Sequence, residues 1–127
     1  MDLKKIFEDE RGYIYLVEDL FESGREFTFL EIKNGFARGG CLHSKDEQMV
    51  VLKGKITFIC GDIEETLVKG DSRKIPAEEP HAFIGLEDSI VSEWGITSED
   101  KKMDRKNPEL RARVDKINEN RKEELKE

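Results

Sequence analysis

The chain has 127 residues, of which 40% are charged and 36% hydrophobic, and its formal net charge is −7. This length fits one domain with a single core, and the negative charge argues against nucleic acid or an anionic membrane as partner. Cys41 and Cys60 are too few for a disulfide framework. We see no signal peptide and no apolar run of membrane-spanning length, so we expect a cytoplasmic protein.

Short apolar or alternating runs, separated by turn residues, extend from residue 6 to about residue 95. Runs rich in β-branched and aromatic residues have strand character; they are 13–20, 26–33, 48–54, 55–61, 63–69, 73–76, 81–85 and 88–95. Repeated short strands at this spacing predict an antiparallel sandwich or barrel. The pattern alone leaves a generic β-sandwich without a site as an alternative.

The composition changes after Trp94. Residues 95–106 are polar and indicate a linker, and Asn107-Pro108 then supplies an N-cap and a first-turn proline. A narrow apolar stripe on the following charged helix comprises Leu110, Val114 and Ile117. We therefore expect a barrel over residues 1–98 and a linker and C-terminal helix over residues 99–127. The stripe would dock against the barrel or a partner subunit.

The only two histidines of the chain lie in segments that a barrel could bring together. On a strand, residues 41 and 43 point to the same face, so Cys41 and His43 can enter one cavity. Glu47 lies beyond a short turn and can return to that cavity. A second segment, distant in sequence, adds His81.

These two segments resemble the paired motifs of the cupin superfamily. The first motif is Gly, five residues, His-x-His, three or four residues, Glu, six residues, Gly; the second is Gly, five residues, Pro-x-Gly, two residues, His. The matching residues are His43, Glu47 and Gly54 in the first motif and Gly70, Pro76 and His81 in the second. Cys41 stands at the first His position and Glu78 at the Gly position of the second motif. The resemblance implies an all-β, cupin-type double-stranded β-helix, a jelly-roll barrel, with a C-terminal α-helix.

Many cupins hold a metal ion at the motif positions, which here carry Cys41, His43, Glu47 and His81. Thiolate, imidazole and carboxylate together suit Zn²⁺ and, less specifically, Fe²⁺ and other first-row ions. The cofactor implied is thus a divalent metal, Zn or Fe, or otherwise none. Cys41 has the alternative reading of a small buried residue.

Within the superfamily, three short segments are similar to the RmlC-like dTDP-sugar epimerases and ketoisomerases. Residues 7–12 resemble their DxRG segment, residues 38–43 their RGxHxH run, and residues 75–83 their IPxGxxHxF segment. In those enzymes the first His of the run removes a proton beside the sugar ketone, and an Arg or Lys pairs with the diphosphate. Cys41 stands at the position of that base here, and Trp94 stands where the epimerases carry a Tyr that acts as the catalytic acid.

The sugar-nucleotide resemblance implies its own roles. Arg38 would clamp an anion, since two glycines follow it and would let a ligand approach the backbone. His43 would be a substitute catalytic base, and Glu47 and His81 would orient the substrate. Trp94 is a candidate ligand-binding aromatic side chain.

Three functions stay open on the sequence. They are a small cupin that binds a small polar ligand at a metal site, a metal-free nucleotide-sugar isomerase or epimerase, and a non-catalytic ligand sensor. A small molecule is the partner in each. Because the strand over residues 13–20 is long and apolar enough to need cover as an edge, and small cupins often pair through N-terminal strands, we also expect a homodimer.

Overall fold

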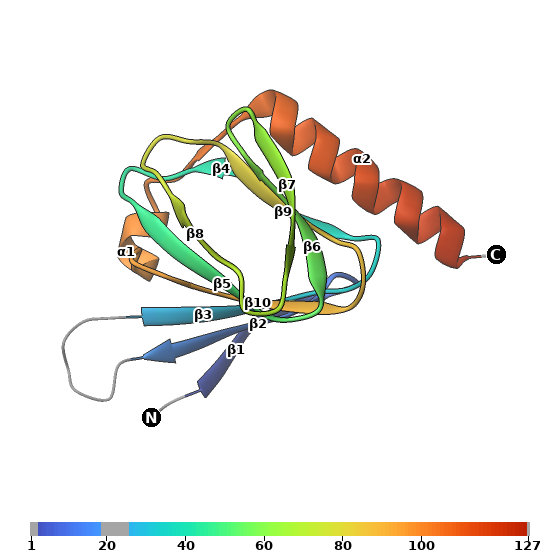
Figure 1. The fold of residues 1–127 in the computed structure, drawn as a ribbon, viewed down its shortest axis with the longest axis horizontal. Helices are drawn as coiled ribbons and strands as arrows, with labels where there is room; N and C mark the ends of the chain where they lie inside the picture. Colours follow the sequence, from blue (N-terminus) through green and yellow to red (C-terminus); the bar gives the residue numbers. More distant parts are fainter. Residues whose placement is uncertain (1–2, 19–25, 127) are drawn as a thin grey trace.

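Two antiparallel sheets face each other in the computed structural model, which describes residues 3–18 and 26–126 (Figure 1). The six-stranded sheet has the order β1 (Leu3–Asp9), β2 (Gly12–Glu18), β3 (Glu26–Ile32), β10 (Ser89–Trp94), β5 (Glu47–Lys53) and β8 (Ser72–Ile75). The five-stranded sheet has the order β11 (Arg105–Lys106), β4 (Ala37–Leu42), β9 (His81–Gly85), β6 (Lys55–Cys60) and β7 (Ile63–Val68). The helices are α1 (Ser98–Lys101) and α2 (Pro108–Leu125). This confirms the predicted all-β fold with a C-terminal helix.

The main core lies between the two sheets because alternate residues of facing strands point inward. In β5, Met49 and Val51 are buried while Val50 and Leu52 are half-buried or exposed. The buried residues of this cluster are Leu30, Ile32, Met49, Val51, Ile56, Phe58, Cys60, Leu67, Ile75, Phe83 and Val91. Burial of Cys60 agrees with its position in the apolar run of β6.

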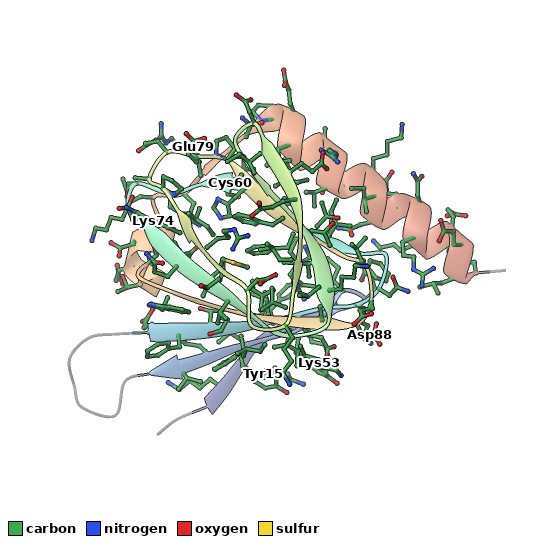
Figure 2. The ribbon with its side chains drawn as sticks, viewed as in Figure 1. Tyr15, Lys53, Cys60, Lys74, Glu79 and Asp88 are labelled. Carbon is green, nitrogen blue, oxygen red and sulfur yellow. The ribbon has the colours of Figure 1, made fainter. Side chains whose placement is uncertain are left out.

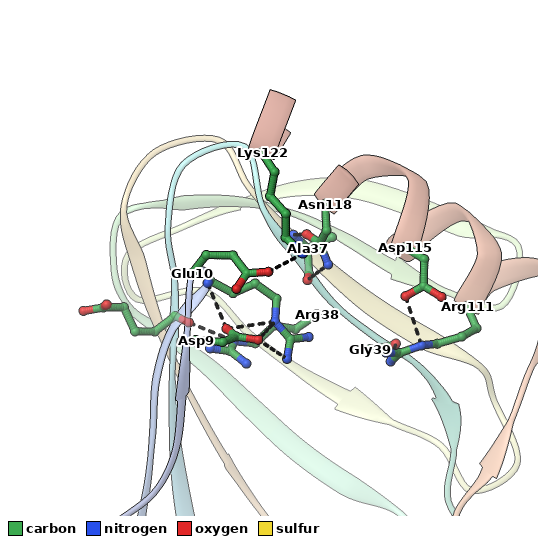
Figure 3. A network of polar contacts seen from close by, with 11 residues as sticks. Asp9, Glu10, Ala37, Arg38, Gly39, Arg111, Asp115, Asn118 and Lys122 are labelled. Atoms are coloured by element: carbon green, nitrogen blue, oxygen red, sulfur yellow. Dashed lines mark hydrogen bonds and ion pairs between the residues drawn. The ribbon is translucent and has the colours of Figure 1, made fainter. Parts of the chain in front are cut away.

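Helix α2 packs on the outside of the five-stranded sheet, across β4 and β9 (Figure 1). Its stripe residues contact Ala37, Ile59 and Ala82 in a second apolar cluster, which confirms the predicted docking against the barrel. The buried Asn118 side chain accepts a hydrogen bond from the Ala37 N–H at 2.7 Å and donates one to its carbonyl at 3.0 Å (Figure 3). Both main-chain groups of Ala37 are thereby satisfied under the helix.

Close neighbours, rather than an open ligand space, surround the two glycines after Arg38: β9 at Gly39 and α2 at Gly40. A Cβ on Gly40 would lie 2.8 Å from the Cα of Arg111, and one on Gly39 would lie 2.6 Å from the His81 carbonyl oxygen. Both glycines have positive φ, and the pairing of β4 with β9 shifts register between Gly39 and Cys41. The glycine pair therefore forms a bulge that lets the helix approach the sheet.

Three segments differ from the sequence-based expectation. The charged N-terminal residues form β1, an edge strand that pairs with β2, where no strand was predicted. The strand predicted over residues 13–20 is observed as β2, and residues 19 and 20 lie outside the described residues. The expected linker contains α1 and β11, and β11 pairs with β4. None of the described helices is long and apolar enough to cross a membrane.

Candidate metal centre

Three buried side chains from separate elements meet at one end of the barrel interior. His43 follows the last residue of β4, Glu47 begins β5 and His81 begins β9. Their nearest ligand atoms all lie within 4.8 Å of one another. Glu47 Oε1 is 3.4 Å from His43 Nε2 and 3.8 Å from His81 Nε2. The structure thus brings together three of the four residues that the sequence assigned to a metal.

The Oε1 atom of Glu47 is buried and accepts no hydrogen bond of good geometry, although it faces two imidazole nitrogens. Glu47 itself is only 1% exposed. A buried carboxylate oxygen without a partner is costly, and a cation bound between it and two imidazoles would remove that cost. The donor set therefore fits a divalent metal.

His81 has the protonation state that a metal ligand needs. Its Nδ1 lies 3.1 Å from the Glu79 carbonyl oxygen, so Nδ1–H donates there and Nε2 keeps its lone pair toward Glu47. Burial is the main cause that lowers the pKa of His81, and the nearby charge of His43 lowers it further. His81 is therefore a neutral imidazole at neutral pH.

His43 lies between two carboxylates. Its Nδ1 is 2.6 Å from Asp104 Oδ1, and its Nε2 faces Glu47. Burial alone would lower the pKa of His43, but the close contacts with the carboxylates of Glu47 and Asp104 outweigh it and raise the pKa to about 9. Without a metal, His43 therefore carries a proton at neutral pH, which a bound ion would displace from Nε2.

A second buried carboxyl group, Glu93 of β10, lies behind Glu47. Burial and the charge of Glu47 raise the pKa of Glu93 to about 8, so Glu93 is protonated at neutral pH. Burial alone would raise the pKa of Glu47 too, but the contacts with His43 and Glu93 lower it below its usual value. The ionised Glu47 thus has a neutral acid beside it, as expected for two carboxyl groups that share a buried site.

Cys41 does not join the cluster: its sulfur does not lie within 4.8 Å of all three other ligand atoms. The thiol is half-buried, and its pKa is raised by burial and then by the charge of Asp104. The assignment of Cys41 assumed that residues 41 and 43 alternate on one strand. β4 ends at Leu42 and carries the bulge at Gly40, so simple alternation does not apply to this pair.

The other two predicted ligand contacts differ from each other: Arg38 interacts electrostatically with Glu93, whereas Trp94 lies on the outer face of the sheet. Arg38 is buried near the turn between β1 and β2, beside Asp9 (Figure 3), and its Nε donates to the Glu31 carbonyl at 2.8 Å. Burial, followed by the charge of the neighbouring Arg11, lowers its pKa to about 10. Trp94 packs on Phe27 with ring centroids 6.3 Å apart.

Trp94 and Glu93 point to opposite faces of the six-stranded sheet. Glu93 pairs with the inward Met49, whereas Trp94 pairs with Gln48 and Phe27. Glu93 was not predicted from the sequence, because the motif resemblance drew attention to Trp94 at the neighbouring position. Strand alternation would have indicated Glu93, because residues 91 and 93 point to the same face and Val91 points inward. Asp104 was missed because its segment had the composition of a linker.

A cleft of about 880 Å³ is lined by residues of β6, β7, β8 and the start of α2, and none of the three cluster residues lines it. Its lining includes inward residues of β6, β7 and β8, namely Phe58, Cys60, Glu65 and Arg73. Arg73 Nε donates a hydrogen bond to Glu65 Oε1 at 2.5 Å, which links the two sheets. Cys60 is the cross-strand partner of His81. The cleft therefore reaches the strand position next to the candidate ligand, and its volume suits a small molecule. Cys60 and Glu79 are labelled at this end of the barrel in Figure 2.

The fold, but not the sequence, matches known proteins: no family model and no curated protein matches the chain. CapF, a capsular polysaccharide assembling protein of Staphylococcus aureus, is similar with a TM-score of 0.65 and 19% identity over 78% of this chain. Oxalate decarboxylase of Bacillus subtilis has a TM-score of 0.69 and 17% identity over 83%. KdgF from Halomonas sp. has a TM-score of 0.59 and 18% identity over 74% of this chain and 84% of its own.

The likeness in fold to these three proteins confirms the predicted cupin-type jelly-roll fold. This chain spans about a third of the two longer relatives, 31% of CapF and 30% of oxalate decarboxylase. At these identities the likeness shows the fold alone.

Proposed function

We propose that this protein is a small cupin that binds a divalent metal through His43, Glu47 and His81 and, at that ion, a small polar ligand. The observation that carries the proposal is the buried, unpartnered Oε1 of Glu47, which faces the Nε2 atoms of both histidines. Similar cupin folds support it at the level of architecture.

Two imidazoles and one carboxylate suit Zn²⁺, Fe²⁺ and related first-row ions. Three protein ligands leave coordination positions open, at which such an ion acts as a Lewis acid toward a carbonyl or carboxylate oxygen. The chain's own residues hold the site ready: Glu79 fixes the tautomer of His81, and Glu93 supports Glu47. Contacts of this kind orient metal ligands and tune their affinity.

The metal-free isomerase or epimerase is the weaker proposal because of the state of His43. A general base must be unprotonated, and the raised pKa of about 9 keeps His43 protonated at neutral pH in the metal-free protein. The guanidinium of Arg38 is only partly free for an anion, since its Nε donates to the Glu31 carbonyl while its buried Nη2 has no hydrogen-bond partner among the described residues.

The test is metal content after equilibrium dialysis of purified protein against Zn²⁺, Mn²⁺ or anaerobic Fe²⁺. We expect about one ion per chain for wild type, and its loss in His81→Ala and Glu47→Gln, because each removes one of three ligands. Cys41→Ala is the matched control, since it alters a motif position outside the cluster and should keep the ion. Absence of stoichiometric metal in folded wild type would overturn the proposal.

A further inference from the structure

Residues 97–106, which we call the cover segment, lie against the turn between β4 and β5 that carries His43. Lys45 Nζ is 2.9 Å from Asp100 Oδ1, and Arg105 forms an ion pair with Glu78. Arg105 and Lys106 of β11 pair with Leu42 and Cys41 of β4. The segment is therefore attached to both sides of the site by side-chain and main-chain contacts.

The cover segment also has ordered structure of its own. Thr97 caps α1: its side chain accepts from the Asp100 N–H, and the Asp100 side chain accepts from the Thr97 N–H in return. Such a reciprocal capping box fixes the start of a helix. Asn107 then donates its N–H to the Gly40 carbonyl at 2.8 Å and caps α2. Both ends of the segment are thus anchored.

Asp104 lies between these anchors and reaches His43. Its Oδ1 is 2.6 Å from His43 Nδ1, and the side chains of Asp104 and His43 are only 20% and 10% exposed. With Nδ1 directed to Asp104, Nε2 of the same ring faces Glu47 at 3.4 Å. The His43 carbonyl accepts a bond from the Glu78 N–H at 2.7 Å, so main chain and ring are both held.

We propose that Asp104 is a positioning residue that holds the His43 ring with Nε2 toward the metal position. The inference rests on the proposed metal site and extends it to a segment outside the β-barrel. A carboxylate that accepts the second imidazole N–H of a ligand orients the ring and raises its basicity, and its loss weakens metal binding. In this proposal the site therefore includes a residue of the cover segment as well as residues of the barrel.

The experiment compares Zn²⁺ affinity, measured by competition with a chelating dye, in wild type, Asp104→Ala, Asp104→Asn and Glu99→Gln. We expect Asp104→Ala to bind about 10–100-fold more weakly. Asp104→Asn should lose less, because its amide oxygen still accepts from Nδ1. Glu99→Gln is the matched control: it removes an acid of the same segment whose side chain is 79% exposed and forms an ion pair with Lys102, so the Zn²⁺ affinity should not change.

A second measurement does not depend on metal. In metal-free protein labelled with ¹⁵N-histidine, a protected downfield proton on His43 Nδ1 should appear in wild type and Glu99→Gln and vanish in Asp104→Ala. His43→Gln assigns the signal, because the chain has only one other histidine.

The outcomes separate this inference from the proposed function. Wild-type Zn²⁺ affinity in a folded Asp104→Ala protein, with wild type itself binding the ion, would overturn the role of Asp104 and leave the metal site standing. If wild type binds no metal, the proposed function fails, and the Nδ1 proton decides alone: its absence from wild type overturns the contact, and its loss in Asp104→Ala supports it.

Discussion

The two faces of the six-stranded sheet differ in the side chains that they carry, although both are built from the same strands. The inner face carries apolar residues and, at one end, the buried carboxyl groups of Glu47 and Glu93. The outer face carries a groove of about 390 Å³ whose lining is largely aromatic and aliphatic, with Tyr15, Phe29, Leu52 and Ile90. Tyr15 and Lys53 project from this side in Figure 2.

Neighbours on one strand therefore have unrelated roles. On the inner face of β5 and β10 the buried carboxyl groups lie near one end of the barrel, with Met49 one inward position behind Glu47 and Val91 one behind Glu93. The difference between the faces teaches that binding residues must be assigned by face as well as by motif position. Four predictions test that distinction, from the largest expected effect to the smallest.

Substitutions on the inner face behind the site should lower the free energy of unfolding without changing metal binding. Met49 is fully buried, so Met49→Ala removes packing and leaves a cavity, which should lower the free energy of unfolding by about 2–5 kcal/mol. Urea denaturation measures the loss. Metal stoichiometry of the folded fraction should stay unchanged, and a folded variant without metal would show that the two parts of this face are not separable.

The site end of the inner face should make the metal-free protein less stable as pH rises. The folded pKa of His43 is about 9 against an ordinary 6.5, so its stabilisation is complete below pH 6.5 and is lost as pH rises through 9. That change amounts to about 3 kcal/mol, because one pKa unit corresponds to about 1.4 kcal/mol. Glu93, raised from 4.5 to about 8, adds a loss in the same direction between those values.

Urea denaturation at pH 6 and pH 9 in the presence of a chelator measures this effect. His43→Gln should flatten the profile above pH 7, and saturating Zn²⁺ should reverse it, since the ion replaces the proton on Nε2. Stability that stays constant or increases toward pH 9 in the metal-free protein would contradict the account of His43.

Glu93 and Trp94 form a matched pair of neighbours on opposite faces. Glu93→Leu removes the acid that supports Glu47 and should weaken Zn²⁺ binding by about 10-fold or more. Trp94→Phe changes only the outer contact with Phe27 and should leave the affinity within about twofold. Chelator competition compares them, and a larger loss in the Trp94 variant would return that residue to the site.

The outer face should affect association rather than the site. Leu52 lines the outer groove and is 41% exposed. The homodimer was expected through residues 13–20 as an open edge, but β1 covers that edge. If a homodimer forms instead through this outer face, Leu52→Glu should give a monomer with stability changed by no more than about 0.5 kcal/mol and metal binding intact. Sedimentation velocity at micromolar concentration measures the state; a wild type that is only monomeric would remove the homodimer.

The sequence predicted the barrel well because its strands alternate, and the apolar stripe of α2 indicated docking. It also predicted His43, Glu47 and His81 as one cluster, through motif spacing rather than periodicity. β1 was not predicted as a strand, because an exposed edge strand tolerates charged residues such as Lys5 and Glu8, and these interrupt the alternating apolar pattern.

The positions of Cys41 and Asp104 were not predicted correctly, because residue spacing does not report local backbone geometry. The bulge at Gly40 and the end of β4 at Leu42 separate Cys41 from the His43 cluster. Glu78 occupies a glycine position of the motif and keeps the positive φ of 68° that glycine would supply. Asp104 reaches His43 through tertiary pairing of β11 with β4, which no local pattern of the polar segment records.

The central claim is a metal ion held between the two imidazoles and Glu47, and anomalous diffraction tests it most directly. Crystals grown with Zn²⁺ and measured at the zinc edge should show one strong peak inside the barrel, bonded to His43 Nε2, Glu47 and His81 Nε2, at about 2.0–2.2 Å from each. A map with no peak there, or with zinc only on exposed acids of the surface, would contradict the account.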